Sequence, residues 1–122
     1  MRMAIGSAAS LVAALTAVPA DAAPAQRPPA FAICATCHKV AAGERSLLGP
    51  NLWRIGGRRA GSVLGFAYSP AMRQAGVSWT RPRLIAFITN PRAVVPGTRM
   101  AYAGQRDSRA AAVIADYLLS LR

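Results

Sequence analysis

Two cysteines and the chain's one histidine stand within five residues, in the segment Cys34-Ala35-Thr36-Cys37-His38. Side chains three positions apart on a helical turn lie on the same side, so both sulfurs can face one ligand. Two thiols in this arrangement can form thioether bonds to the two vinyl groups of a haem, and the adjacent imidazole then reaches its iron. The spacing predicts one covalently attached haem c, with His38 as an iron ligand.

Three other interpretations of these residues remain open. A structural zinc site needs four nitrogen or sulfur ligands, whereas the chain has two cysteines and one histidine. A thioredoxin-like redox pair would accompany a βαβ pattern, and the sequence has no run of strand type. A plain disulfide suits an exported protein but requires that His38 follow the pair by chance. Haem attachment is favoured, and the second axial ligand then separates an electron carrier from a gas-binding or catalytic haem.

Met100 is the best candidate for that second ligand. Outside the first 25 residues the chain has only Met72 and Met100. A methionine thioether paired with histidine holds the iron of electron-carrying cytochromes and raises their potential. Met100 ends the turn-rich segment 94–100, where the backbone can aim a side chain, whereas Met72 lies in a predicted helix. The alternative is that Met100 fills a gap in the core, as many methionines do.

Short helices must position these residues. Pro28 and Pro29 suit a first helical turn, so a helix over about 29–40 would carry the cysteines and the histidine. Helices are also predicted over about 69–76 and 80–90, each with a serine or threonine N-cap and a glycine or Asn-Pro stop. Asp107 caps a last helix. The residues expected on buried helical faces are Leu84, Phe87, Ile88, Ala110, Val113, Ile114, Tyr117, Leu118 and Leu121.

Residues 41–68 predict no regular element and hold six of the ten glycines. A loop of this length counts against a compact domain unless it wraps a large ligand that serves as part of the core. The sequence therefore predicts an all-α domain built around its cofactor.

The first residues have the layout of a secretory signal peptide. Arg2 precedes an apolar stretch over 8–18, and small residues suited to cleavage follow it. We predict that residues 1–25 are a signal peptide, cleaved between about 22 and 25, and that 26–122 form one periplasmic domain. An uncleaved anchor is the alternative, although the apolar stretch is shorter than the ~20 residues that cross a bilayer.

The chain is strongly basic, with 15 Lys and Arg against four Asp and Glu and a net charge of +11. Arg2 and Asp21 fall in the predicted signal peptide and their charges cancel, so the domain keeps this charge. A basic surface favours an acidic partner. Export and the lack of an arginine-rich run with interleaved aromatics exclude nucleic acid, which leaves acidic redox proteins and transient contact with membrane complexes.

From about Ala30 to Leu121 the sequence resembles the class I cytochrome c family, particularly mitochondrial cytochrome c and bacterial cytochromes c2. Besides the haem motif, the segments that carry the resemblance, in the family's order, are Gly49-Pro50-Asn51-Leu52, Gly57-Arg58-Arg59-Ala60-Gly61, Gly65-Phe66-Ala67-Tyr68, Gly76-Val77-Ser78-Trp79, Asn90-Pro91 and Pro96-Gly97-Thr98-Arg99-Met100. The resemblance implies a small all-α fold of about four to five short helices wrapped around one covalent haem.

The resemblance also implies roles for individual residues. Met100 is the second iron ligand, and the Pro50 carbonyl accepts a hydrogen bond from the ring N–H of His38, which fixes the tautomer. The implied cofactor-binding residues are Cys34, Cys37, His38, Pro50, Arg58, Tyr68, Trp79, Thr98 and Met100, and the implied iron ligands are His38 and Met100.

Arg58, Tyr68 and Trp79 are similar to the residues around a buried haem propionate, where charged and N–H or O–H donors offset the burial of a carboxylate. Thr98 is similar to a residue that hydrogen-bonds near the haem.

Four positions depart from the family pattern. Phe87 replaces a tyrosine near the methionine sulfur, and Met72 occupies a position that is usually polar. Phe31 is one place away from the expected aromatic of the first helix, so its packing against the last helix is in question. Tyr102 replaces a phenylalanine at the haem edge.

These observations predict a monomeric one-electron carrier between redox proteins such as an oxidase, a reaction centre, a bc1-type complex or a dehydrogenase, and not an enzyme. Arg45, Arg92 and Arg99 are the expected docking cations. Two alternatives are the haem subunit of a periplasmic dehydrogenase complex, and a peroxidase or gas sensor with an open iron.

Overall fold

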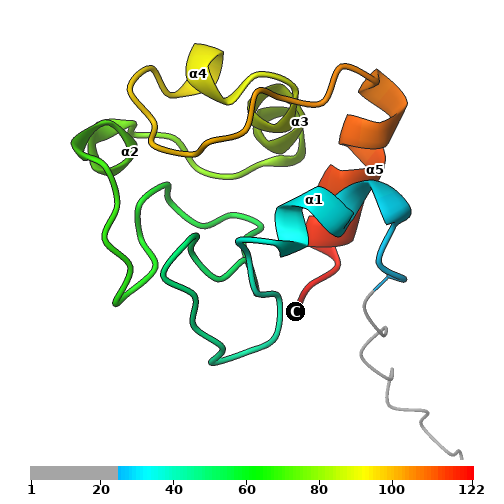
Figure 1. Cartoon of the computed structure of the whole chain (residues 1–122), viewed down its shortest axis with the longest axis horizontal. Helices are drawn as coiled ribbons and strands as arrows, with labels where there is room; N and C mark the ends of the chain where they lie inside the picture. Colours follow the sequence, from blue (N-terminus) through cyan, green and yellow to red (C-terminus); the bar gives the residue numbers. More distant parts are fainter. Residues whose placement is uncertain (1–24) are drawn as a thin grey trace, which may run out of the picture.

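The computed structural model describes residues 25–122, so nearly all of the predicted signal peptide lies outside the described residues. The described part has a 3₁₀ turn and five α-helices: η1 (Pro29–Phe31), α1 (Ala32–Ala35), α2 (Pro70–Gln74), α3 (Arg81–Thr89), α4 (Pro91–Val94) and α5 (Ser108–Leu119). Extended pairing within 25–122 is limited to one isolated bridge between Arg59 and Ser78. The predicted all-α class is confirmed. In Figure 1, α1 crosses α5 on one side, while α2 lies on the other side beyond the long loop.

The two longest helices begin at the predicted caps and pack against each other. The Thr80 hydroxyl accepts a hydrogen bond from the Arg83 N–H at 3.4 Å, and the Asp107 carboxylate accepts from Arg109 at 2.9 Å. Such caps satisfy backbone donors that have no partner inside the helix. The predicted inner face of α3 is confirmed, because Leu84, Phe87 and Ile88 are all buried.

The inner face of α5 differs from the predicted one. Val113 is about half exposed, while Ala111 and Ala115 are completely buried beside Ile114. Alanine carries too little apolar surface to stand out in a hydrophobic pattern, but its small side chain lets neighbouring backbones approach. Because α5 packs against both α3 and η1, the buried face turns toward these small residues.

The predicted first helix over 29–40 is wrong in its length, since α1 ends at Ala35. The backbone N–H groups of Cys37 and His38 both donate to the Cys34 carbonyl, at 3.1 and 2.9 Å. The Thr36 hydroxyl donates to the Ile33 carbonyl at 2.7 Å. Sharing one carbonyl tightens the last turn, and the chain leaves the helix at the histidine.

Phe31 settles how the first helical segment packs. Its side chain is completely buried, and its ring meets Tyr117 edge-on with centroids 5.0 Å apart. The shift of the aromatic by one position therefore leaves no gap against α5.

Phe31→Ala is expected to destabilise the folded protein by about 3–5 kcal/mol, because it removes a buried ring from a packed contact. The measurement is guanidinium unfolding followed by circular dichroism. Val113→Ala, on the exposed side of α5, is the control and should change the free energy of unfolding by less than about 1 kcal/mol. Equal effects of the two substitutions would contradict this account of the core.

No helix or strand is assigned between Ala35 and Pro70, as predicted for residues 41–68. Hydrogen bonds hold this long loop instead. The Asn51 amide donates to the carbonyls of Ala41 and Glu44, both at 2.7 Å. The Leu52 N–H donates to the Lys39 carbonyl at 2.9 Å. Hydrogen bonds within the loop thus hold its conformation. The loop forms one wall of the cavity described below.

α4 was not predicted. Asn90 ends α3 as expected, but its side chain also accepts a hydrogen bond from the Ala93 N–H at 3.2 Å and so caps another turn. Pro91 occupies the first position of that turn, where its missing N–H costs nothing. The turn leads into the segment that carries Met100.

Candidate functional site

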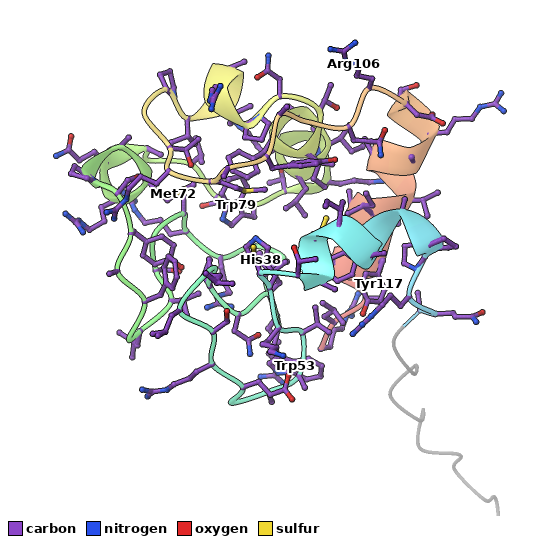
Figure 2. The ribbon with its side chains drawn as sticks, in the orientation of Figure 1. His38, Trp53, Met72, Trp79, Arg106 and Tyr117 are labelled. Atoms are coloured by element: carbon purple, nitrogen blue, oxygen red, sulfur yellow. The ribbon has the colours of Figure 1, made fainter. Side chains whose placement is uncertain are left out.

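A cavity of about 550 Å³ lies between the long loop, α3, α5 and the segment that follows α4. Apolar and aromatic side chains make up much of its wall, including Leu84, Phe87 and Ile114. Figure 2 shows His38 and Trp79 near the centre of the molecule, and Trp53 at the outer side of the long loop. A mostly apolar cavity of this size with a few polar groups is typical of a cofactor site.

His38 is held against the cavity wall by two consecutive residues. Its Nδ1 lies 2.8 Å from the Pro50 carbonyl oxygen, so the predicted contact is present. With the proton on Nδ1 donated to this carbonyl, Nε2 keeps a lone pair for a metal. A Cβ on Gly49 would lie 2.9 Å from His38 Cε1 and Nδ1, so only glycine leaves room for the ring.

The surroundings of His38 favour its neutral form. Burial lowers the pKa of the imidazole, and the hydrogen bond to Pro50 partly opposes this shift. A neutral imidazole is the form that binds a metal.

Cys34 and Cys37 line the same cavity, and both are unpaired and partly buried. Burial raises the pKa of the Cys34 thiol, and the nearby Cys37 adds to this shift. Within residues 25–122 no group of three or more His, Cys, Asp or Glu side chains is placed to hold a metal ion. The zinc interpretation therefore finds no ligand set here. A cavity that offers one imidazole, two thioethers and two thiols fits a metal that arrives in an organic cofactor.

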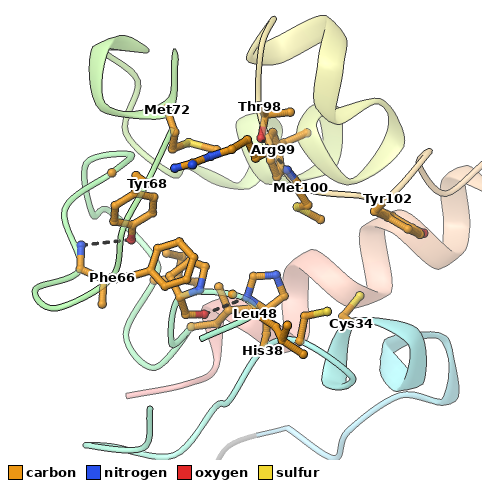
Figure 3. Close-up of a pocket in the computed structure, with 18 of the residues that line it drawn as sticks. Cys34, His38, Leu48, Phe66, Tyr68, Met72, Thr98, Arg99, Met100 and Tyr102 are labelled. Carbon is orange, nitrogen blue, oxygen red and sulfur yellow. Dashed lines mark hydrogen bonds between the residues drawn. The ribbon is translucent and has the colours of Figure 1, made fainter. Parts of the chain in front are cut away.

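Met100 lies on the wall opposite His38, as Figure 3 shows. The Thr98 hydroxyl accepts a hydrogen bond from the Met100 N–H at 3.3 Å, and the Thr98 N–H donates to Val95 at 3.0 Å. These bonds fix the backbone that carries the thioether. Met72 also lines the cavity, but it comes from α2 and lies near Tyr68, away from His38. The structure thus brings both methionines to the site and sets Met100 across from the histidine.

Tyr68 and Trp79 line the cavity, as the sequence analysis expected. The Tyr68 hydroxyl accepts a hydrogen bond from the Val63 N–H at 3.1 Å, and burial raises its pKa. Trp79 packs against Phe87, with ring centroids 4.9 Å apart. Phe87, where the family resemblance implies a tyrosine, therefore packs against another aromatic ring.

Arg58 is the predicted site residue that the structure does not bring to this cavity. Its guanidinium donates to the Trp53 carbonyl at 2.7 Å and lines a separate cavity of about 310 Å³. The adjacent Arg59 lines the main cavity instead. Sequence reasoning missed Arg59, although two successive arginines were the signal that one of them would face inward.

Arg99 is both exposed to solvent and part of the cavity wall. It is exposed, as expected for a docking cation, but it also lines the cavity, and its guanidinium donates to the Ala67 carbonyl at 3.1 Å. Arg73 donates to the next carbonyl, Tyr68, at 2.7 Å. Two guanidinium groups are thus bound to the segment that forms the Tyr68 end of the cavity.

Comparisons with known proteins agree with this geometry. No family model matches the chain. Cytochrome c2 iso-2 from Magnetospirillum fulvum is 38% identical over 97 residues, which cover 80% of this chain and all of the relative. Cytochrome c-550 from Nitrobacter winogradskyi is 41% identical over 65% of this chain and 73% of its own length. Among solved structures, cytochrome cH from Methylobacterium extorquens aligns with a TM-score of 0.68 and 34% identity, over 73% of this chain and 89% of that one.

Proposed function

This chain belongs to the class I cytochrome c family, and on that premise we propose that it is a periplasmic carrier in a respiratory or photosynthetic chain, with its iron held by His38 and Met100. Like its relatives it is a monohaem electron-transfer protein that carries haem c, and not an enzyme. The bound haem supplies one iron that alternates between the ferrous and ferric states. The chain's residues hold that iron and keep water from it.

The observation that carries the proposal is the placement of Met100 and His38 on opposite walls of one apolar cavity. Each ligand is fixed by its own neighbours: His38 by Pro50, and Met100 by Thr98. Ligands held in this way move little when the charge of the iron changes, and a small rearrangement favours fast transfer. A site filled on both sides also disfavours substrate binding at the metal, which argues against a peroxidase or gas sensor.

The test is a visible spectrum and a redox titration of protein expressed in a periplasm with c-type maturation. We expect a covalent c-type haem spectrum, a reversible one-electron wave, and no carbon monoxide binding to the native ferrous protein. Cys34→Ala with Cys37→Ala should abolish covalent attachment. Rapid carbon monoxide binding by the wild-type protein would overturn the carrier proposal in favour of an open iron.

The location of the protein is part of the proposal. Within residues 25–122 no helix is both long and apolar enough to cross a membrane. The predicted signal peptide, residues 1–25, would deliver the domain to the periplasm, where haem attachment and partner encounter would follow. The mass of the purified mature protein tests this point, because cleavage between about 22 and 25 removes a defined segment.

Alkaline stability of the iron–sulfur bond follows from the composition. The family resemblance implies that a deprotonated lysine can displace the methionine at high pH. Here Lys39 is the single lysine, and all other fixed cations are arginines, which do not lose their proton in that range. We expect the sulfur-to-iron absorption band of the ferric protein to persist above about pH 9. Loss of the band near that pH in a spectrophotometric titration would refute the expectation.

Acidic redox proteins are the proposed partners, in view of the net charge of +11. Arg45 and Arg92 are exposed, and Arg99 is exposed at the cavity. Cations around an exposed cofactor edge steer association with acidic surfaces, and added salt weakens this attraction.

One observation favours the second candidate function, the haem subunit of a dehydrogenase complex. Ile33, Leu47 and Leu48 line the cavity and are exposed. Exposed apolar side chains grouped at a functional site are typical of a surface that a partner protein covers. A complex that survives gel filtration would support this function over that of a freely diffusing carrier.

A further inference from the structure

We propose that the smaller cavity, the one that Arg58 lines, binds a phosphate group, with the guanidinium groups of Arg45 and Arg58 as its main donors. The phosphate belongs to a soluble phosphate ester or to a lipid headgroup, since both present the same kind of oxygens. We call this cavity the arginine pocket. The inference goes beyond the carrier function and does not require it.

The arginine pocket lies between two segments of the long loop. Its wall consists of residues 43–46 and 63–66 together with Pro50, Asn51, Trp53 and Arg58. Figure 2 shows Trp53 on the outer side of the loop, away from Met72 and Trp79. The volume of about 310 Å³ is at the lower end of the roughly 300–1,000 Å³ found for ligand sites. The pocket therefore has room for a small ligand.

The guanidinium of Arg45 reaches across to the second of these segments. A Cβ on Gly65 would lie 3.7 Å from Cζ and Nη1 of Arg45 and 3.8 Å from Nη2, so the guanidinium lies directly beside this glycine. Within residues 25–122 the arginines whose side chains donate hydrogen bonds are Arg27, Arg58, Arg73, Arg81 and Arg99. The five N–H donors of Arg45 are therefore available to a ligand.

Arg58 and Ser46 supply further donors. Arg58 uses one N–H group for the Trp53 carbonyl, at 2.7 Å, which fixes the guanidinium at the wall and leaves its other donors free. The Ser46 hydroxyl accepts from the Leu48 N–H at 3.2 Å, so its own proton can be donated to a ligand. The Asn51 amide is fully used, because it donates to two carbonyls and accepts from the Trp53 N–H. Two guanidinium groups and one hydroxyl thus remain to hold a ligand.

The charge of the wall selects an anion. The wall contains two guanidinium groups and one carboxylate, that of Glu44, and its net charge is positive. Glu44 pairs with neither arginine, because the one ion pair within residues 25–122 joins Arg81 to Asp116. Each guanidinium presents a planar fork that matches two oxygens of a carboxylate or a phosphate. Two forks and a hydroxyl can use more than the two oxygens of a carboxylate, which favours the three or more of a phosphate group.

The experiment is an isothermal titration of the haem-loaded protein with inorganic phosphate at constant ionic strength. We expect one saturable site per chain. Arg45→Gln should weaken binding about tenfold, the loss expected for one charge-assisted hydrogen bond. Arg92→Gln is the matched control, because Arg92 is also exposed but lines neither cavity. It should change the Kd less than about twofold, since salt screens a distant charge.

A second probe separates the two sources of the phosphate group. Vesicles of phosphatidylglycerol in phosphatidylcholine present the group on a surface, and co-sedimentation compares their binding to the same two variants. Vesicle binding that Arg45→Gln weakens more than Arg92→Gln would identify a lipid headgroup. Saturable binding of inorganic phosphate without such an effect on vesicles would identify a soluble phosphate ester.

Other results would overturn the proposal and leave the carrier function standing. Equal losses in the two variants with both probes would mean that net charge alone attracts the anion. Acetate that binds as tightly as phosphate would assign the arginine pocket to carboxylates. Absence of saturable binding with both probes would leave the pocket without a phosphate ligand. Failure of the carrier function would instead be seen in the visible spectrum and in carbon monoxide binding, neither of which the pocket controls.

Discussion

Met100→Leu is expected to lower the midpoint potential by on the order of 0.1–0.3 V, a substantial part of the ~0.8 V range that axial ligands set. A thioether raises the potential because it favours the ferrous iron, and leucine removes the sulfur while nearly keeping the volume. Met100 lies opposite His38, so with Met100 as the proposed second ligand its loss should open one side of the iron. The variant should also lose the sulfur-to-iron absorption band and bind carbon monoxide when reduced.

Met72→Leu is the matched control, because Met72 lines the same cavity and carries the same chemical group. It should keep the absorption band, and its potential should stay within a few tens of millivolts of the wild-type value, about 1 kcal/mol or less for a one-electron couple. If Met72→Leu lost the band and Met100→Leu kept it, the ligand assignment would be reversed. If neither variant lost it, the iron would have another second ligand.

The caps show why local sequence predicts helix starts well. Ser69, Thr80 and Asp107 each accept the hydrogen bond expected of an N-cap. This chemistry acts between residues two or three positions apart, so it can be seen in the sequence without knowledge of the fold. The one-turn helix α4 was not predicted, because Asn90 both ends one helix and caps the next.

The loop side chains show what the sequence could not decide. In a helix or strand, periodicity says which residues point inward, but residues 41–68 have no period. Whether Arg58 or Arg59 faces the cavity depends on the carbonyl of Trp53, which binds the Arg58 guanidinium. The haem-attachment motif was easier to recognise, because two cysteines and one histidine in a fixed spacing carry their own chemistry.

Leu47 and Leu48 illustrate a different limit. In the sequence they are two apolar residues before Gly49, indistinguishable from a short buried run. Their exposure depends on the conformation of the long loop, which the Asn51 amide stabilises by donating hydrogen bonds to two carbonyls of the same loop. Tertiary hydrogen bonds of this kind have no local sequence signal, so the exposure of these two leucines could be found only in the structure.

Gly49→Ala carries the second large expected effect. The added Cβ would lie 2.9 Å from the His38 ring and 3.0 Å from the Cys37 carbonyl oxygen. The carbonyl belongs to backbone that cannot rotate away, so the ring must move and its hydrogen bond to Pro50 must weaken. We expect the ferric haem-loaded protein to lose about 1–3 kcal/mol of stability in guanidinium unfolding, as for other overpacked sites. A changed Soret spectrum should accompany the loss, because His38 is the proposed iron ligand.

Gly56→Ala makes the same chemical change where the obstacle can yield. Its Cβ would meet only Leu119 Cδ2, at 2.9 Å, and that methyl group can turn away. Restricting the unfolded chain then makes this variant neutral or more stable by up to about 1 kcal/mol. Alanine should therefore destabilise the protein at position 49 and leave its stability unchanged or raised at position 56. If Gly49→Ala matched Gly56→Ala in both stability and spectrum, the histidine would have room beside Gly49, and the Gly49–Pro50 segment could not be what fixes the imidazole.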